Sequence, residues 1–112
     1  MATAFAIEAA HIQEIGHLSV ADLARATGTN ETTVRAWLRG SRSPSGVRAE
    51  RLAELSSIVE RLARVMEPSY VPVWLRKPVP LLDDDKPLDV LGAGDYRRVS
   101  RVIAGLEAPG AV

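Results

Sequence analysis

The chain has no cysteine, few aromatic side chains and no excess of charge of either sign. The absence of cysteine excludes disulfides, thiol nucleophiles and thiolate metal sites, and it suits a reducing cytoplasm. Acidic and basic residues number 14 each, so the overall charge gives no argument for a nucleic acid or a membrane as partner. The apolar runs are only a few residues long, and no charged segment precedes a hydrophobic one. We therefore expect a cytoplasmic protein without a membrane span or a secretory signal.

Residues from which an enzyme or a metal site could be built are also scarce. The only histidines, His11 and His17, are not the i, i+4 pair of a helical zinc site. The run Asp83–Asp85 lacks the ligand pattern and turn glycine of a calcium-binding loop, which favours a solvated acidic turn. There is no phosphate-binding glycine loop and no nucleophile elbow. The sequence therefore predicts a protein that is not an enzyme and that needs neither a cofactor nor a metal.

Helical periodicity is what the sequence does have. A chain of 112 residues, 46% of them hydrophobic, can bury one modest core, or two small ones if a partner covers the rest. Apolar residues recur at steps of three and four in several segments, which predicts an all-α fold. We expect helices over residues 3–15, 20–28, 31–39, 47–66 and 87–91, and a last helix from Tyr96. No strand is expected beyond a short extended piece near 79–82.

Capping signals mark the ends of several of these helices. Ser19, with Asp22 three residues later, offers a variant of the capping box. Asn30 can cap the following helix and Asp95 the last one. Gly28 can adopt the positive φ of a helix C-cap. These signals predict a tight turn between two short helices.

The sequence changes character near residue 67. Before it, one face of the long helix carries an apolar seam that needs a partner surface, made of Leu52, Leu55, Val59, Leu62 and Met66. After it, prolines repeatedly interrupt a short apolar region. We therefore divide the chain into residues 1–66, a helical bundle with a long fourth helix, and residues 67–112, a small helical domain broken by prolines.

Residues 19–40, SVADLARATGTNETTVRAWLRG, have the spacing of a helix-turn-helix. That motif needs a small residue where its helices cross, a turn residue that tolerates positive φ, and a branched apolar anchor in the second helix. Ala24, Gly28 and Val34 fall at those positions, and Trp37 adds a large anchor. The alternative is a pair of ordinary core helices joined by a glycine turn.

The outer face of the second helix is a candidate for reading DNA. Positive charge concentrates in residues 35–51, where five arginines face Glu50 alone. In a major groove, the N-terminal outer residues of such a helix approach base edges, and residues beyond its end approach phosphates. Glu31 either complements the helix dipole, which we favour, or accepts a hydrogen bond from cytosine. The candidates are Thr32, Thr33 and Arg35 for bases, and Arg39 and Arg42 for phosphates, with Arg48 as a further candidate.

Over about residues 5–45 the chain resembles the Xre-type, phage-repressor-like helix-turn-helix family. The resemblance implies binding as a dimer to a two-fold operator, although some members keep the fold for protein contacts alone. Paired half-sites would also compensate for the small basic patch of one monomer.

The segment VWLRKPVPLLDDDKPLDVLGAGDYRRVSRVI resembles the toxin-binding domain of the Xre/MbcA/ParS antitoxins, and the likeness spans about residues 55–108. The family pattern is Trp-Leu, a proline-rich bend, Pro-Leu-Asp-Leu-Leu, a glycine and a final helix. Its positions here are Trp74, Leu75, Pro78, Pro80, Pro87, Leu88, Asp89, Val90, Leu91, Gly94 and the helix from Tyr96. The chain departs from the pattern at Val79, where the family often has Asn, and at Asp83–Asp85, where it often has a glycine. These departures bear on the detailed toxin contact more than on the family.

The resemblance implies the antitoxin of a type II toxin–antitoxin system. Its implied partner is a RES-domain toxin that consumes NAD, held inactive when the C-terminal region of the antitoxin covers the active-site cleft. Operator DNA is the second implied partner, with repression of the chain's own operon, and a homodimer or a larger toxin–antitoxin assembly is expected. The candidate toxin-binding residues are Trp74, Leu75, Leu81, Leu82, Arg97, Arg98, Arg101 and Val112.

Alternatives stay open for these residues and for the whole chain. Core packing is the favoured role for Trp74, and the three arginines form either a solvated face or an anchor on an acidic toxin surface. The chain could also be a free-standing Xre-type regulator whose C-terminal region serves dimerisation. A third possibility is an adaptor protein whose helix-turn-helix domain no longer binds DNA.

Overall fold

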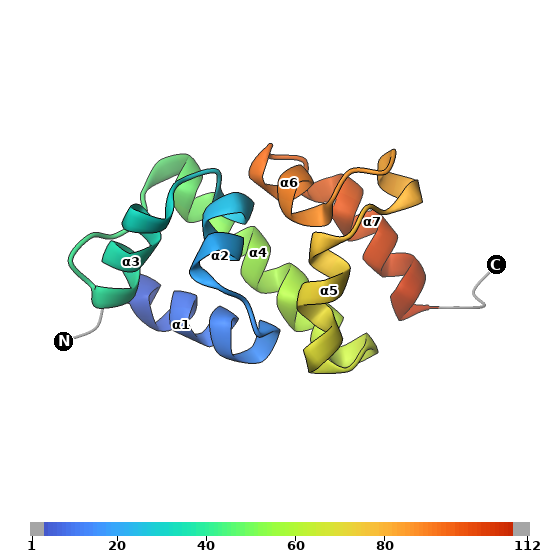
Figure 1. Cartoon of the computed structure of the whole chain (residues 1–112), viewed down its shortest axis with the longest axis horizontal. Coiled ribbons are helices and arrows are strands. Elements are labelled where there is room, and N and C mark those ends of the chain that lie inside the picture. Colours follow the sequence, from blue (N-terminus) through green and yellow to red (C-terminus); the bar gives the residue numbers. More distant parts are fainter. Residues whose placement is uncertain (1–3, 109–112) are drawn as a thin grey trace.

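The computed structural model describes residues 4–108, and within that range all regular structure is helical. This confirms the all-α prediction. Seven α-helices and two short 3-10 helices follow one another along the described chain (Figure 1). Their bounds are α1 Ala4–Gly16, α2 Val20–Thr27, α3 Glu31–Arg39, α4 Gly46–Val65, η1 Pro68–Tyr70, α5 Val71–Arg76, η2 Pro80–Leu82, α6 Pro87–Gly92 and α7 Tyr96–Glu107.

The turn between α2 and α3 is built from the capping residues that the sequence predicts. The Ser19 hydroxyl accepts a hydrogen bond from the Asp22 N–H at 3.1 Å, and the Asp22 carboxylate accepts one from the Ser19 N–H at 2.9 Å. This reciprocal pair is a capping box. Gly28 ends α2 with φ 70°, in the left-handed region. The Asn30 side chain accepts from the Thr33 N–H at 2.8 Å and so caps α3.

Three local predictions need correction. Asp95 stands at the N-cap of α7 but makes no capping hydrogen bond through its side chain, which lies 3.8 Å from Arg98 instead. The piece near 79–82 is not extended, because Pro80–Leu82 forms η2. The sequence also failed to predict α5, where Pro72 lies in the first turn. A proline is compatible with that position because the first helical N–H groups have no partner within the helix.

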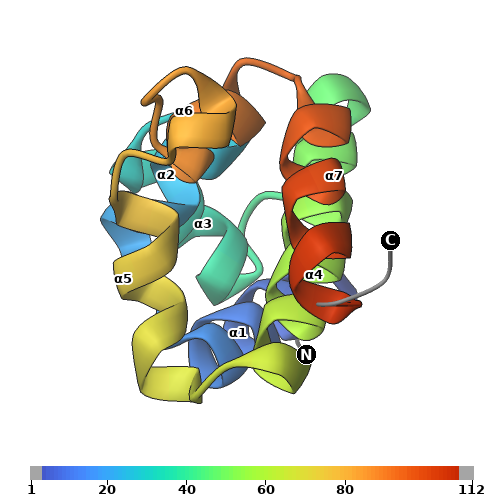
Figure 2. The same cartoon turned by 90° about the vertical axis from the view of Figure 1, so that its right-hand side faces the viewer.

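Helix α4 is the central element of the fold. Helices α1 and α2 pack on it, α3 packs on α1 and α2, and α7 runs along α4 on the side that faces away from them (Figure 1). Seen end-on, α4 and α7 lie side by side, with α5 and α6 across from them beside α2 (Figure 2). The molecule is elongated, with extents of 47 × 23 × 20 Å.

One hydrophobic core extends through both parts of the chain. The fully buried side chains of α4 contribute to it along the whole helix, namely Leu52, Leu55, Ile58, Val59 and Leu62. Residues 71–103 supply the other half of the same core. The boundary that we place near residue 67 falls at the turn after α4, and buried residues on its two sides pack together. Removal of the C-terminal part would therefore expose the apolar face of α4.

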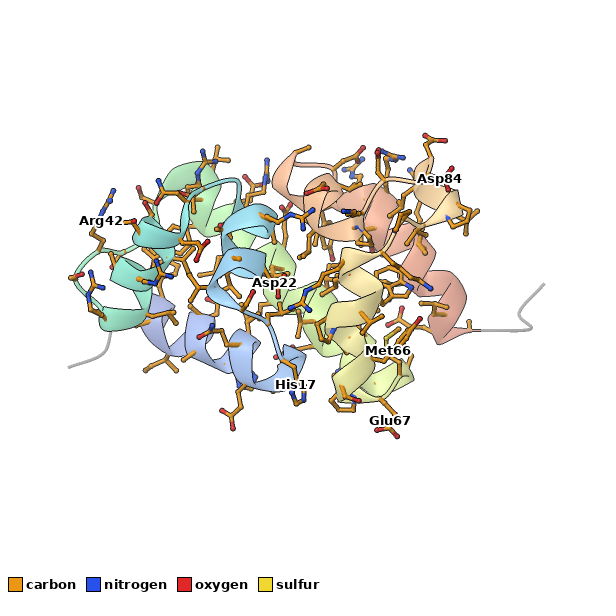
Figure 3. The ribbon with its side chains drawn as sticks, viewed as in Figure 1. His17, Asp22, Arg42, Met66, Glu67 and Asp84 are labelled. Carbon is orange, nitrogen blue, oxygen red and sulfur yellow. The ribbon has the colours of Figure 1, made fainter. Side chains whose placement is uncertain are left out.

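Two Arg–Asp pairs join α2 to the C-terminal helices. Arg76, the last residue of α5, donates two hydrogen bonds to Asp22, one of them at 2.9 Å from Nε. Arg25 donates two hydrogen bonds to Asp89 of α6, at 2.7 and 3.1 Å. The two pairs differ in burial: Asp22 lies inside the molecule between α2 and α5 (Figure 3), whereas Asp89 is exposed.

The ion pair with Arg76 changes the acidity of the buried Asp22. Burial by itself would raise the pKa of Asp22, but the hydrogen bonds from Arg76 and Ser19, with the charge of Arg76, outweigh it. The pKa of Asp22 is therefore held below its ordinary value of 3.8. The ionised form is the one that closes the capping box and binds Arg76.

Helices α2 and α6 also touch through their backbones. A Cβ atom placed on Gly92 would lie 2.1 Å from the Arg25 carbonyl oxygen, a distance at which no side chain fits. Glycine at this position lets the two helices approach until main-chain atoms meet. The C-terminal part is thus locked against the first helix of the helix-turn-helix.

We expect Asp22→Ala to lower the free energy of unfolding by about 2–3 kcal/mol at neutral pH, because it removes the capping box and leaves Arg76 without its partner. The folded-state pKa of Asp22 lies below the unfolded one. Its stabilisation is therefore complete above the unfolded pKa and is lost as the pH falls through the folded value. Denaturant unfolding at neutral pH and at steps below about pH 4 measures the difference in free energy of unfolding between the unsubstituted chain and the variant. This difference should shrink on acidification.

The matched control is Asp89→Ala, which breaks the same kind of pair at the surface. The Arg25 and Asp89 side chains are 39% and 54% exposed, so this loss should be only about 0.5 kcal/mol. Equal losses for the two variants would contradict the argument from burial.

We expect Gly92→Ala to destabilise the chain by about 3 kcal/mol, because α2 and α6 must separate to admit the new methyl group. Thermal unfolding followed by circular dichroism measures the effect. The matched control is Gly105→Ala in α7, where the added Cβ would meet no atom within 4 Å. That control should raise the stability by up to about 1 kcal/mol, through helix propensity alone.

Candidate functional site

Helix α3 has one buried face and one face that is exposed to solvent. Its buried side includes Val34 and Trp37, which close the core of the helix-turn-helix. Thr32, Arg35 and Arg39 lie on the opposite, exposed face, as the sequence predicts for a helix that reads DNA. The structure thus presents three of the five predicted DNA-binding residues on one open surface.

Arg35 is not a free cation in this structure. Its guanidinium lies 3.0 Å from the carboxylate of Glu31, one turn earlier, and both side chains are about half exposed. An i, i+4 pair at the surface is weak, so Arg35 can exchange this partner for another acceptor. Before it contacts a base it has to release Glu31 or bring Glu31 with it.

A small hollow lies between the turn before α3 and the loop after it. Its volume is about 190 Å³. Two guanidinium groups, four hydroxyl groups and the ring of Trp37 line it, from Thr29, Thr33, Trp37, Arg42, Ser43, Pro44, Ser45 and Arg48. Thr33, predicted as a base reader, is partly buried and belongs to this hollow. Guanidinium and hydroxyl donors in one hollow suit the oxygens of a phosphate.

Three arginines near this hollow have no acidic partner. Among residues 4–108, no carboxylate lies within ion-pair distance of Arg39, Arg42 or Arg48. Arg51, by contrast, lies 2.9 Å from Glu54. Arg42 projects from one end of the molecule (Figure 3). The basic patch is therefore narrower than the predicted span of residues 35–51, because Arg35 and Arg51 are paired with glutamates. Its unpaired charge is centred on the loop after α3.

Three of the predicted toxin-binding residues are core residues, which corrects the assignment of Leu75 and Leu82 and agrees with the core packing favoured for Trp74. Trp74 is 6% exposed and Leu75 is fully buried, both packed in the shared core from α5. Leu82 of η2 is also fully buried. Their side chains are covered by this chain itself, so they support the surface without forming it. Val112 lies outside the residues that the structure describes.

The other predicted toxin-binding residues do lie at the surface. Leu81 is 80% exposed, the highest value among the large apolar side chains of the described chain. A second hollow of about 280 Å³ is lined by Leu81 together with Arg98, Arg101 and Val102 of α7. Arg97 is exposed on the same helix but does not line this hollow. The sequence analysis did not single out Val102 as part of the surface.

The acidic turn forms contacts within the chain. Asp83 and Asp84 have φ angles of 56° and 64°, and Asp83 lies 3.2 Å from Arg98. No cluster of three or more potential metal ligands occurs among the described residues, and none of their helices is long and apolar enough to cross a membrane. The turn thus orders the loop before α6.

Two features of these surfaces escaped the sequence analysis. The hydroxyl groups of the first hollow come from α3 and from the loops before and after it, and no local pattern indicates that they meet. The hollow beside α7 could have been anticipated in part, because Arg98 and Val102 are four residues apart and so share one helix face. The position of Leu81 opposite them depends on the tertiary fold.

Comparison with known proteins gives matches to the helix-turn-helix and to the whole fold. A helix-turn-helix family model matches residues 16–55. The mycobacterial cidal antitoxin MbcA of Mycobacterium tuberculosis H37Rv is 34% identical over 71 residues, which are 63% of this chain and 63% of that protein. The probable mycobacterial cidal antitoxin Rv3188 of the same strain is 33% identical over 78 residues, 70% of this chain and 66% of that protein. These alignments span slightly less than two thirds of the relatives' length.

The structural likeness extends further than the sequence alignments. A chain in the crystal structure of the M. tuberculosis MbcT–MbcA toxin–antitoxin complex superposes with a TM-score of 0.83 and 25% sequence identity. The superposition covers 98% of this chain and 99% of that chain. The helices after α4, which the family model does not reach, are therefore part of the shared fold.

Proposed function

Because the chain carries an Xre-type helix-turn-helix and is homologous to the MbcA antitoxins, we propose that it is the antitoxin of a type II toxin–antitoxin system. The observation that carries this proposal is the match of nearly the whole chain to a chain of a toxin–antitoxin complex, with a TM-score of 0.83. The match includes α5, α6 and α7, which a DNA-binding head alone would not need. In this proposal the chain acts by binding.

The proposed partner is a RES-domain toxin that consumes NAD. Support comes from the resemblance of about residues 55–108 to the toxin-binding domain of the Xre/MbcA/ParS antitoxins. In the structure the apolar residues of that pattern hold α5 and α6 in place, and Leu81 and the arginines of α7 form the open surface beside them. The chain would inhibit the toxin by covering its active-site cleft.

The second proposed activity is binding to the operator of the chain's own operon. Support comes from the exposed face of α3 and from the unpaired Arg39, Arg42 and Arg48 beside a hollow lined with hydroxyl groups. Phosphate contacts of this kind position a recognition helix, and base contacts from Thr32 and Arg35 would give specificity. A homodimer would double the small number of charges that each chain contributes.

We expect the product of the gene adjacent to this one to arrest growth and deplete cellular NAD when it is expressed alone, and expect this chain to restore both. The two proteins should also purify together as a stable complex. Growth curves, NAD measurement and affinity purification from co-expressing cells check the three expectations. A neighbouring product that is harmless alone and forms no complex would leave the free-standing regulator as the better reading.

The test uses the full chain for a structural reason. Truncation after residue 66 would expose Ile58 and Leu62 on α4, so a loss of protection would not distinguish a missing toxin contact from failure to fold. Substitutions at exposed residues avoid that ambiguity.

For DNA, we expect the double variant Arg42→Ala and Arg48→Ala to weaken binding to all sequences alike and to reduce the slope of log K against log salt by about 2, roughly one for each phosphate contact. Arg35→Ala should instead reduce discrimination between operator variants, at a cost of about 1–3 kcal/mol for the preferred base. Fluorescence anisotropy on promoter fragments at several salt concentrations measures both effects.

The control for the DNA measurement is Arg64→Ala, which removes an exposed arginine near the C-terminal end of α4, the end away from the first hollow. It should leave affinity and salt slope unchanged. If the double variant behaves like this control, the phosphate assignment is incorrect, whatever the outcome of the toxin experiment.

A further inference from the structure

Leu81 is held in an exposed position by the turn that contains it. A 3-10 helix has three residues per turn, so neighbouring side chains in η2 point in different directions. Leu82 is fully buried, and Leu81 is consequently turned outward to 80% exposure. An isolated exposed leucine needs no explanation, but one at the wall of a hollow offers an apolar surface on which a partner can pack.

The loop around Leu81 is stiffened by its own backbone. The Leu82 N–H donates to the Val79 carbonyl at 2.8 Å, and the Val79 N–H donates to the Asp85 carbonyl at 3.1 Å. Arg98 of α7 fixes the loop from the side through Asp83, at 3.2 Å. Leu81 is therefore presented without the entropy loss that ordering a flexible loop would add to binding.

The opposite side of the hollow is one face of α7. Arg98, Arg101, Val102 and Gly105 stand at i, i+3, i+4 and i+7, and residues at that spacing share one side of a helix. The first three line the hollow with Leu81. Gly105 continues the same face by one turn.

Gly105 has no role that this chain itself explains. It lies inside α7, where glycine is less favourable than alanine, and its φ is not positive. A Cβ at this position would meet no atom within 4 Å. The helix surface is therefore bare here although nothing in the described chain approaches it. A bare helix surface lets another protein come close to the backbone.

The charge of this face is only partly compensated. Arg98 lies near Asp83 and Asp95, at 3.2 and 3.8 Å. Arg101 has no acidic partner among the described residues. An arginine beside an apolar hollow can bind a carboxylate through two parallel hydrogen bonds.

We propose that the groove between Leu81 and α7, made of Leu81, Arg98, Arg101, Val102 and Gly105, is the docking site for the toxin, an assignment that rests on the proposed antitoxin function. The occupant is an apolar side chain of the toxin with a carboxylate beside it. The apolar side chain lies on Leu81 and Val102 and over the bare surface at Gly105. The carboxylate accepts hydrogen bonds from Arg101, the free cation at the rim.

The test measures the affinity of the full chain for the product of the adjacent gene by isothermal titration calorimetry. Leu81→Ala should weaken binding about tenfold through loss of apolar contact, and Arg101→Glu by at least tenfold through repulsion of the carboxylate. Gly105→Ala should weaken it about fivefold by keeping the partner off the helix. The same Gly105→Ala variant should raise the Tm of the free chain by about 4 °C. Instability of the fold could not produce that combination.

Two matched controls accompany these variants. Ile7→Ala removes an apolar side chain that is 61% exposed on α1, away from the groove. Arg64→Glu makes the same charge change as Arg101→Glu, but at an exposed arginine of α4 that does not line the groove. Both controls should bind the toxin within about twofold of the unsubstituted chain.

Each alternative outcome has a distinct meaning. If the unsubstituted chain binds the toxin and the three groove variants bind equally well, the groove is not the docking site and the antitoxin function stands. Equal losses for Arg64→Glu and Arg101→Glu, with none for Leu81→Ala, would show general charge attraction in place of a specific groove. Self-association that Leu81→Ala abolishes, with toxin binding unchanged, would assign the groove to a second copy of this chain. No binding by the unsubstituted chain would overturn the groove and the proposed function together.

Discussion

The apolar side chains of α4 have to be covered from two directions, and the rest of the fold meets that requirement. Helices α1 and α2 cover α4 on one side, while α7, α5 and α6 complete the core. Polar links join the two parts at α2, where Asp22 binds Arg76 and Arg25 binds Asp89, and at α4, where Arg61 binds Glu107. The helix-turn-helix and the C-terminal helices are therefore supported by the same core.

The same contacts explain how a chain without net charge can offer free cations. Several carboxylates are already paired with arginines of the same chain: Asp22 binds Arg76, Asp89 binds Arg25 and Glu107 binds Arg61. Among the arginines of the described chain that these pairs leave over, Arg39, Arg42 and Arg48 gather at the loop after α3, and Arg101 lies on α7. The positive charge at each surface depends on which arginines are already paired within the chain. The net charge of the whole chain does not show this.

The sequence predicted those parts of the structure that depend on neighbours along the chain. The capping box at Ser19, the glycine after α2 and the apolar face of α4 are local patterns, and all were confirmed. Helix α5 was missed because Pro72 was read as an interruption, although a proline in the first turn is compatible with a helix. The exposure of Leu81 and the burial of Leu82 could not be predicted, because they depend on how η2 packs against α7. Trp74, for which core packing was favoured over a partner contact, is part of the core.

The close approach of α6 to α2 also bears on any larger assembly. Main-chain atoms meet at Gly92, with no room for a side chain. The basic hollow after α3 and the groove beside α7 therefore have little freedom to turn relative to each other. Arg42 and Asp84, which lie toward opposite ends of the long axis, mark how far apart those surfaces are (Figure 3). Two such chains on a two-fold operator would hold their outer ends at a fixed distance and direction. The spacing of the half-sites along the DNA would then set the arrangement of whatever the outer ends carry.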